Sequence, residues 1–288
     1  HIVDASGETD IEGKPTENYD VSKDIEFLEE ELNNWYSNIL KKIWKSFARK
    51  AEVEKEEFYK AVAKQFSGLK VNEDDVKDVL RKLNFSEKPS MWNDKQINKF
   101  ASELRKMTKP MIIAANKIDT EKGYENYHKL RAEFPHLIIM PCSADSEVAL
   151  RQAAKVGLIE YIPGDTDFKI VGKLSEKQKQ ALEKIKKNVL NLFIGGTGVQ
   201  QILNCAVFGL LKYIAVFPAG ATKLADSKGN ILPDCFLLPP NSTALDFAYF
   251  LHTDFGKNFI KAIDARTKKA LGKDYKLKNR DALEIVTR

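Results

Sequence analysis

The chain has 288 residues, of which 43% are hydrophobic and 30% are charged, and its 46 basic and 41 acidic side chains give a net charge of +5. This composition is that of a globular chain with enough residues for two or three domains, and it excludes a disordered or fibrous protein. The three cysteines form no CxxC pair and the four histidines form no H-x-x-x-H pair, which argues against a disulfide framework and against a metal site.

No signal peptide opens the chain, so we expect a cytoplasmic protein without a membrane partner. The most apolar stretch, ILNCAVFGLLKYIAVF at residues 202–217, is interrupted by Lys212 and is too short to cross a bilayer. We predict that it forms a buried helix that runs into a strand. The mild excess of positive charge is compatible with an RNA or ribosomal partner.

The first residues, His1-Ile2-Val3, have the pattern of the end of a buried strand, and Asp4-Ala5-Ser6-Gly7 predicts the turn that leaves it. Because a domain does not begin at the end of a strand, we expect the chain to enter a fold midway.

From about Val21 to Lys109, apolar residues recur with helical spacing. One face of a long first helix is predicted to carry Ile25, Leu28, Leu32, Trp35, Ile39 and Ile43. Three shorter helices are expected after it, one through Phe58, one that begins at the N-cap Asn72, and one that begins near Asn93. Four amphipathic helices with short polar joints predict a helical module.

The pattern then changes to strands that alternate with helices. The run PMIIAA at residues 110–115 is typical of a central parallel strand, and HLIIMPCSA at 136–144 predicts a second buried strand. A polar loop follows each strand, and helices are expected near 124–134 and 148–156. This order predicts a doubly wound α/β sheet, in which ligands bind at the carboxyl ends of the strands.

The remaining chain predicts a helix at 174–193, an interhelical turn at GGTG (Gly195–Gly198), and a strand-rich segment from Tyr213 onward. That segment contains one predicted helix, with Thr243 as N-cap and Asp246 completing a capping box. It suggests a small α+β domain of roughly 75 residues.

The loop Asn116-Lys117-Ile118-Asp119 has the pattern of a guanine-recognition loop. Guanine carries an N1–H and a 2-amino group, and the Asp119 carboxylate can accept from both, whereas adenine offers neither donor there. Asn116 can bridge the base and the neighbouring backbone, and the stem of Lys117 can lie over the purine face. After the next strand, Ser143-Ala144 can present a backbone N–H to guanine O6. The alternative is a polar loop with a helix-capping aspartate.

No phosphate-binding loop accompanies this base loop in the sequence. A Walker loop reads G-x-x-x-x-G-K-[ST], because its backbone N–H groups and lysine surround the phosphates, and none of the four Gly-Lys pairs fits this pattern. Asp4–Gly7 and Asp226–Gly229 both match D-x-x-G, the γ-phosphate sensor of GTPases. We interpret the first as the end of the strand that follows the sensor and the second as a surface turn.

Longer stretches resemble the YchF/Obg-like GTPases of the translation-factor class, in their archaeal form. The similar stretches run nearly end to end and are HIVDASGETDIEG, DIEFLEEELNNW, KPMIIAANKID, LRQAAKVGLIEYIPGD, LSEKQKQALEKI, TGVQQILNCAVFGLL and LPDCFLLPPNSTALDFAYFLHTDFG. The resemblance implies part of a P-loop NTPase-type G domain (1–20 and 106–212), a helical insertion (21–105) and a C-terminal β-grasp (TGS) domain (213–288). It also implies that the P-loop, the catalytic residues and the Mg²⁺ ligands precede His1.

From the resemblance we expect GTP and GDP as ligands, Mg²⁺ as cofactor, and slow GTP hydrolysis linked to the ribosome. It implies guanine-binding roles for Asn116, Lys117, Asp119, Ser143 and Ala144. Some relatives hydrolyse ATP and have Glu at the Asp position, so Asp119 favours guanine. Near the C-terminus, Asn279-Arg280-Asp281 departs from the Gly-Asp turn common in TGS domains, which leaves the geometry of that turn open.

A second hypothesis is an RNA- or ribosome-binding adaptor without nucleotide hydrolysis in this chain. Basic residues crowd the C-terminal segment, and we select Arg266, Lys268 and Lys269 as candidate RNA contacts, with Phe259 and Tyr275 among them. The alternative is a solvated face with the aromatic rings in the core. The basic run at residues 41–50 predicts the solvated face of a helix, with a partner surface as the alternative.

Overall fold

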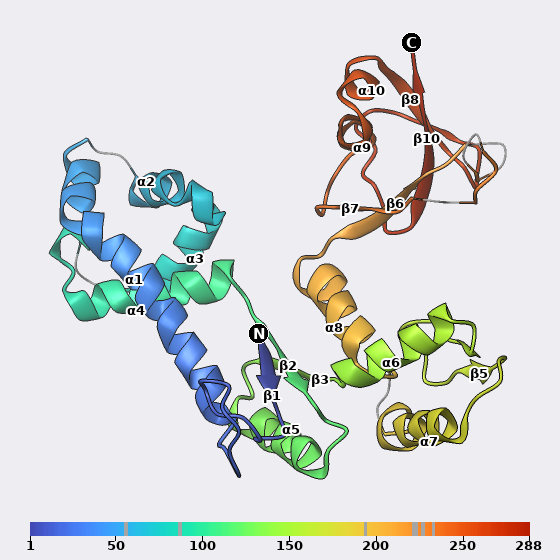
Figure 1. Cartoon of the computed structure of the whole chain (residues 1–288). Helices are drawn as coiled ribbons and strands as arrows, with labels where there is room; N and C mark the ends of the chain where they lie inside the picture. Colours follow the sequence, from blue (N-terminus) through green and yellow to red (C-terminus); the bar gives the residue numbers. More distant parts are fainter. Residues whose placement is uncertain (55–56, 86–87, 193–194, 221–223, 226–227, 232–233) are drawn as a thin grey trace. The chain divides into compact units, whose positions relative to one another are not determined.

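The structure, a computed structural model, describes residues 1–54, 57–85, 88–192, 195–220, 224–225, 228–231 and 234–288. It divides into two compact units, His1–Ile202 and Leu203–Arg288. The helices and strands up to the division are β1 (Ile2–Asp4), α1 (Ser22–Val53), α2 (Phe58–Gln65), α3 (Glu73–Leu83), α4 (Asp94–Thr108), β2 (Ile112–Asn116), α5 (Glu121–Glu133), β3 (Ile138–Pro141), α6 (Ala144–Lys155), β4 (Ile159–Glu160), β5 (Lys169–Ile170) and α7 (Glu176–Ile185), with short 3₁₀ turns at Ser67–Leu69 and Pro89–Met91 and a π-helical turn at Lys186–Leu190 (Figure 1).

The four predicted helices of the first unit are present as α1 to α4 and share one core. Asn72 and Asn93 each begin a helix with a capping box, in which side chain and backbone bond reciprocally over three residues. Trp44 of α1 stacks on Trp92 with ring centroids 5.3 Å apart and contacts Phe100 of α4. Burial of these large aromatic rings is the main force that holds the module together.

The buried face of α1 differs from the predicted one. Trp35, predicted to be buried, is 46% exposed, whereas Tyr36 is 1% exposed and its hydroxyl lies 2.8 Å from Oγ1 of Thr108. The six predicted positions are about 3.6 residues apart on average, which is the period of an α-helix, so periodicity alone does not exclude the neighbouring stripe that contains Tyr36. Packing against α4 selects the stripe with Tyr36, Leu40 and Trp44 as the buried face.

The α/β part of the first unit contains a parallel sheet in the order β1-β2-β3. β2 lies in the centre, as predicted, and its residues from Ile112 to Ala115 are buried. The prediction of a buried first strand was wrong for Ile2, which is 72% exposed, although Val3 is 1% exposed. Successive side chains of a strand point to opposite faces, and the Val3 face packs with residues of α1 and α5.

The segment after β3 packs as a smaller layer. α6, α7 and the short β4–β5 hairpin share a core around Leu150, Ile159, Leu182 and Leu190. The helix predicted for 174–193 ends as the π-helical turn, and its last predicted residue, Phe193, lies outside the described residues. The interhelical turn predicted at Gly195–Gly198 is present.

The chain from the division onward contains α8 (Val199–Asn204), which spans it, and then a π-helical turn (Cys205–Leu210), β6 (Ile214–Pro218), β7 (Phe236–Leu238), α9 (Ala244–Leu251), α10 (Thr253–Lys257), β8 (Phe259–Asp264), β9 (Ala270–Leu271) and β10 (Asp281–Thr287) (Figure 1). The sheet has the order β7-β6-β10-β8-β9, in which β6 and β10 are parallel and the other neighbours are antiparallel. Together with the helices, it forms the predicted β-grasp fold around a core that includes Val216, Phe247, Ala262 and Leu283.

Three sequence expectations for this unit have different outcomes. The capping box of Thr243 and Asp246 begins α9 as predicted. The expectation of one helix was wrong, because His252 adopts an extended backbone that ends α9 and then caps a second helix, α10. The D-x-x-G match at Asp226 lies mostly outside the described residues, so its expected surface turn is not described.

The apolar run at 202–217 was wrongly predicted to begin with a buried helix. Neither α8 nor the π-helical turn after it contains a buried residue, and Leu203 and Leu211 are 51% and 52% exposed. The strand half of the run is buried, because β6 lies between β7 and β10. Apolar composition alone does not say which part of a run meets a second layer.

The turn before β10 keeps a left-handed geometry without a glycine. Arg280 has a φ of 70°, its N–H donates to the carbonyl of Ala215 at 2.7 Å, and the Asn279 side chain accepts from the Ala215 N–H at 2.9 Å. These two bonds fix the turn against β6 and offset the strain of a non-glycine residue in this conformation.

Candidate functional site

Three loops meet at the carboxyl edge of the parallel sheet. In the sheet register Asp4 is opposite Asn116 and Ala115 is opposite Pro141, so β1, β2 and β3 end at the same level. Backbone bonds continue past the strand ends, from the Ala5 N–H to the Asn116 carbonyl at 2.9 Å and from the Cys142 N–H to the Ala115 carbonyl at 2.8 Å. The two loops singled out in the sequence are therefore neighbours at the edge where ligands bind in such sheets.

Asn116 joins the first loop to the start of α6. Its Oδ1 accepts a hydrogen bond from the Ala144 N–H at 3.0 Å. The N–H expected to face guanine O6 thus already has a partner within the chain. In the described part of the chain, the Nδ2 group of Asn116 makes no hydrogen bond.

Asp119 is held by the second loop. The Ser143 hydroxyl donates to Asp119 Oδ1 at 2.8 Å, and the Ser146 hydroxyl lies 2.8 Å from Ser143 Oγ. Ser143 is only 1% exposed, so its hydroxyl has a fixed direction. The second oxygen of Asp119, Oδ2, has no hydrogen-bond partner among the described residues and is left to accept from a ligand.

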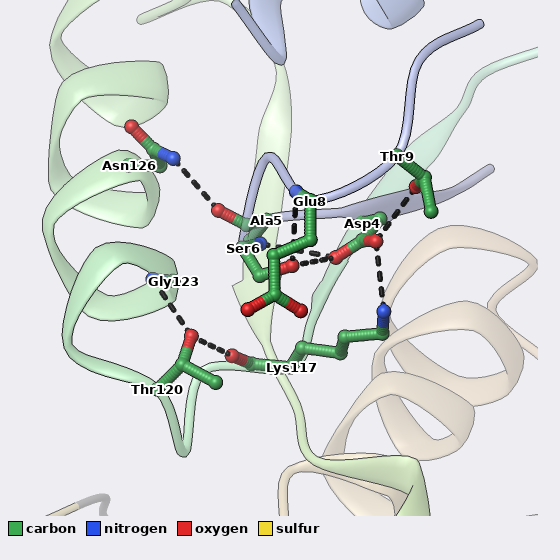
Figure 2. Close-up of polar contacts among 9 residues, drawn as sticks. All are labelled: Asp4, Ala5, Ser6, Glu8, Thr9, Lys117, Thr120, Gly123 and Asn126. Atoms are coloured by element: carbon green, nitrogen blue, oxygen red, sulfur yellow. Dashed lines mark hydrogen bonds and ion pairs between the residues drawn. The ribbon is translucent and has the colours of Figure 1, made fainter. Parts of the chain in front are cut away.

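Lys117 bonds to the end of β1, a contact that we did not anticipate from the sequence. Its Nζ lies 2.9 Å from Oδ2 of Asp4, which also accepts from Thr9 at 2.7 Å, while Oδ1 of Asp4 accepts from the Ser6 hydroxyl at 2.6 Å (Figure 2). Burial acts to raise the pKa of Asp4, but the bonds from Lys117, Ser6 and Thr9 outweigh it and hold that pKa below its usual value. The bond to Asp4 in turn raises the pKa of Lys117.

The backbone of the loop is fixed by the start of α5. Lys117 has a φ of 63°, and its carbonyl accepts from the Thr120 hydroxyl at 2.9 Å, while Thr120 Oγ1 caps the helix by accepting from the Gly123 N–H at 3.0 Å (Figure 2). A Cβ built on Gly123 would lie 2.2 Å from the Lys117 carbonyl oxygen. Only glycine permits this close approach, so Gly123 is part of the loop geometry.

The two loops and Asp4 form one connected arrangement. It includes all five residues selected from the sequence, which are Asn116, Lys117, Asp119, Ser143 and Ala144. Sequence reasoning missed Asp4 as the partner of Lys117. The available signal was its position at the end of a neighbouring parallel strand, where its carboxylate faces the same edge.

The candidate RNA contacts belong to the C-terminal unit. All three are exposed, and two of them bond to backbone carbonyls, Arg266 to Arg280 at 2.6 Å and Lys268 to Ala265 at 2.6 Å. Lys269 is exposed as well. The aromatic residues Phe259 and Tyr275 pack against the hydrophobic core of the unit. This favours the alternative interpretation, in which the basic residues form a solvated face and the aromatic rings belong to the core.

The described residues contain no group of three or more His, Cys, Asp or Glu side chains that could bind a metal ion. The cysteines in the described part of the chain are free, with Cys142 buried. Among its helices, none combines the length and the apolar character that a membrane crossing needs.

Comparison with known proteins gives the family. A model described as Obg-like GTPase YGR210-like, G4 motif-containing domain, matches residues 114–220, and the TGS domain model matches residues 215–287. The chain is 44% identical to an uncharacterized GTP-binding protein of Methanocaldococcus jannaschii, over 99% of this chain and 72% of that protein. It is 34% identical to an uncharacterized GTP-binding protein of Schizosaccharomyces pombe, over 85% of this chain and 62% of that protein.

A crystal structure of a GTP-binding protein from Pyrococcus horikoshii OT3 is also similar, with a TM-score of 0.72 and 41% identity, over 100% of this chain and 78% of that one. The family model covers both loops of the site, and the relatives share the chain nearly end to end. The chain belongs to the Obg-like family of GTP-binding proteins, with a C-terminal TGS domain.

Proposed function

We propose that the protein recognises the base of GTP and GDP through Asn116, Lys117, Asp119, Ser143 and Ala144. The observation that carries this proposal is that each of two side chains has one polar atom bonded within the chain and one polar atom left for a ligand. Oδ1 of Asp119 and Oδ1 of Asn116 are each held by the second loop, whereas Oδ2 of Asp119 and Nδ2 of Asn116 have no partner among the described residues. One acceptor and one donor are thus held in fixed directions for a ligand.

This pair matches the edge of guanine. Oδ2 of Asp119 accepts from one of the two guanine donors, N1–H and the 2-amino group, and Oδ1 accepts from the other with the lone pair that Ser143 leaves unused. Asn116 Nδ2 donates to N7, which is an acceptor. The Ala144 N–H is shared between Asn116 Oδ1 and guanine O6. Adenine lacks both donors and would leave the fixed carboxylate unpaired, which costs more than a lost contact alone.

In this proposal Lys117 contributes an apolar contact to the face of the base. Asp4 anchors its Nζ, so the aliphatic stem runs between the loop and β1 with its methylene groups free to cover the purine face. Asp4 is therefore a positioning residue in this proposal.

We further propose slow GTP hydrolysis in connection with the ribosome, with Mg²⁺ as cofactor, as the activity of the complete protein. This part rests on the family, whose members include the similar GTP-binding proteins. In P-loop NTPases, catalysis comes from positioning and from stabilising the charge of the transferring phosphoryl group. The described loops serve that chemistry by fixing the nucleotide through its base.

The test of base recognition is Asp119→Asn in the full-length protein. The amide can donate, so xanthine, which has a carbonyl in place of the 2-amino group, becomes the better partner. We expect the affinity for GDP to fall about tenfold to hundredfold, as for the loss of hydrogen bonds to a charged group, and the affinity for XDP to rise. Isothermal titration with each nucleotide measures both.

The matched control is Glu125→Gln, which removes an exposed carboxylate from the next helix, α5. It leaves both affinities unchanged if the effect is specific. Unchanged GDP affinity in Asp119→Asn would remove Asp119 from the base site.

A second candidate function is RNA or ribosome binding by the C-terminal unit without nucleotide hydrolysis. The observation in its favour is the exposure of Arg266, Lys268 and Lys269 on one turn. If the full-length protein binds RNA in a salt-sensitive way and does not discriminate between GTP and ATP in affinity, the adaptor is favoured over the GTPase.

A further inference from the structure

The GGTG turn at Gly195–Gly198 contacts the second base-recognition loop. Its third residue, Thr197, is fully buried, and its carbonyl accepts a hydrogen bond from the Ser143 N–H at 2.9 Å. The hydroxyl of Thr197 donates to Oε2 of Glu147 at 2.5 Å. One residue therefore holds the loop through its backbone and the first turn of α6 through its side chain.

Glu147 is a buried carboxylate with three donors. It is 4% exposed, and besides Thr197 it accepts from the Tyr161 hydroxyl at 2.8 Å and from Nε of Arg151 at 2.5 Å. Burial acts to raise the pKa of Glu147, but these hydrogen bonds outweigh it and lower that pKa. The group is therefore charged near neutral pH, and its bond to Thr197 is charge-assisted and strong.

Two glycines allow the turn to lie directly against the backbone carbonyls of two other segments of the chain. A Cβ built on Gly198, whose φ is 83°, would lie 2.0 Å from the carbonyl oxygen of Pro141, the last residue of β3. A Cβ on Gly196, whose φ is 71°, would lie 2.3 Å from the carbonyl oxygen of Asp165. A side chain at Gly198 would push the turn away from the end of β3, where the base-recognition loop begins, and one at Gly196 would push it away from Asp165.

We propose that the GGTG turn is a clamp on the second base-recognition loop, and that Thr197 and Glu147 are positioning residues for guanine recognition. This inference rests on the proposed function. Ser143 orients Asp119 through its hydroxyl, and its own backbone is held by Thr197. Loosening the clamp frees Ser143 and Ala144 together, which are the two residues that fix the guanine-specific contacts.

The experiment compares three variants of the full-length protein. Thr197→Val removes the hydroxyl while keeping the shape, and we expect it to lower the affinity for GDP by about tenfold. Thr197→Ser keeps the hydroxyl and restores wild-type affinity. Tyr36→Phe is the matched control, because it removes a buried hydroxyl that bonds Thr108 within the helical module and leaves Glu147 and Thr197 unchanged, and we expect its GDP affinity to stay within about twofold of wild type.

The ratio of GDP to ADP affinity, measured by competition, separates positioning from structural damage. A clamp lowers the ratio in Thr197→Val, because only guanine uses these contacts, whereas general damage to the nucleotide site lowers both affinities and leaves the ratio unchanged. Amide hydrogen exchange of residues 142–146 gives a readout without nucleotide, and we expect it to be faster in Thr197→Val than in Tyr36→Phe.

The variant Asp119→Asn distinguishes a failure of the clamp proposal from a failure of the proposed guanine recognition. If that variant shifts preference from GDP to XDP while Thr197→Val leaves the GDP-to-ADP ratio and the exchange unchanged, the clamp is wrong and guanine recognition stands. If Asp119→Asn has no effect on either nucleotide, guanine recognition itself is wrong and the clamp falls with it. If Thr197→Val does not fold, Gly198→Ala tests the clamp through the contact of the turn with the Pro141 carbonyl, and unchanged GDP affinity in that variant would overturn the clamp.

Discussion

Asp4 and Lys117 are 113 positions apart in the sequence, yet their side chains form an ion pair with 2.9 Å between Oδ2 and Nζ. The pair belongs to a small network, because the same carboxylate also accepts from Ser6 and Thr9. A network of this kind fixes the direction of a lysine more firmly than an isolated surface pair does. At this scale, Asp4 contributes to the site by limiting where Lys117 can go.

Asp4→Asn keeps the shape and removes the charge, so it tests this role. We expect GDP affinity to fall by about threefold to tenfold and the free energy of unfolding to fall by about 0.5–1 kcal/mol, a modest value because Lys117 is partly exposed. Glu12→Gln, which alters an exposed ion pair with Lys14, is the control and leaves both quantities unchanged.

The pH dependence of the same variant has a definite sign. The pKa of Asp4 in the folded protein lies below the ordinary value of 3.8. The stabilisation by its carboxylate is thus complete above that value and is lost as pH falls through the lower folded pKa. Urea unfolding of wild type and Asp4→Asn therefore gives a difference near neutral pH that shrinks in acid. A difference that grows in acid would contradict the assignment.

At the scale of elements, α1 and α4 are joined by a buried ion pair. Arg105 of α4 is 2% exposed, and its two terminal nitrogens donate to the two carboxylate oxygens of Glu29 at 2.8 Å each. Its Nε donates to Asn33 at 3.2 Å. This bidentate geometry fixes the rotation of α4 against α1, because a change of register would leave a buried guanidinium without its partner.

We expect Glu29→Gln to destabilise the helical module by about 3 kcal/mol, since it leaves the Arg105 charge buried and only partly paired. Lys82→Ala breaks the more exposed pair with Glu103 and should change stability by at most about 1 kcal/mol. All three tryptophans of the chain, Trp35, Trp44 and Trp92, lie in this module, so urea unfolding followed by tryptophan fluorescence reports on it alone. Equal midpoints for the two variants would show that the pair does not hold the helices.

The elements that the sequence predicted well depend on short-range chemistry. The helices at Asn72, Asn93 and Thr243 begin where a side chain can cap the backbone within three residues. The exchange of Trp35 for Tyr36 on the buried face, and the burial of Arg105, depend on the partner helix instead. Periodicity gives an apolar face to within about one residue, and packing decides the rest.

The distinction between short-range chemistry, which the sequence reveals, and long-range contacts, which it does not, also holds for the whole molecule. The placement of the two loops at one edge of the sheet could be predicted, because each loop directly follows a strand of the sheet. The Asp4–Lys117 and Glu147–Thr197 contacts could not, because they join positions 113 and 50 residues apart with no local pattern. Glycine-rich turns such as Gly195–Gly198 give no signal of what they approach, since that depends on the path of a distant backbone.

The net charge of +5 raises the question of a nucleic-acid partner for the molecule as a whole. If the C-terminal unit binds RNA through its exposed basic turn, each lysine–phosphate contact releases counterions. We then expect Lys269→Ala to reduce the slope of log affinity against log salt by about 0.7 for a single-stranded RNA oligonucleotide. Fluorescence anisotropy at several salt concentrations measures the slope.

Lys41→Ala is the matched control, because it removes an exposed lysine from α1 in the other unit. If both variants keep the wild-type slope, the basic turn does not contact the RNA backbone. If both reduce it equally, binding is a property of the net charge rather than of the C-terminal unit. A loss confined to Lys269→Ala, together with an unchanged preference for GDP over ADP, would make RNA binding and guanine recognition separate functions of the two units, because the change lies outside the residues that hold the base.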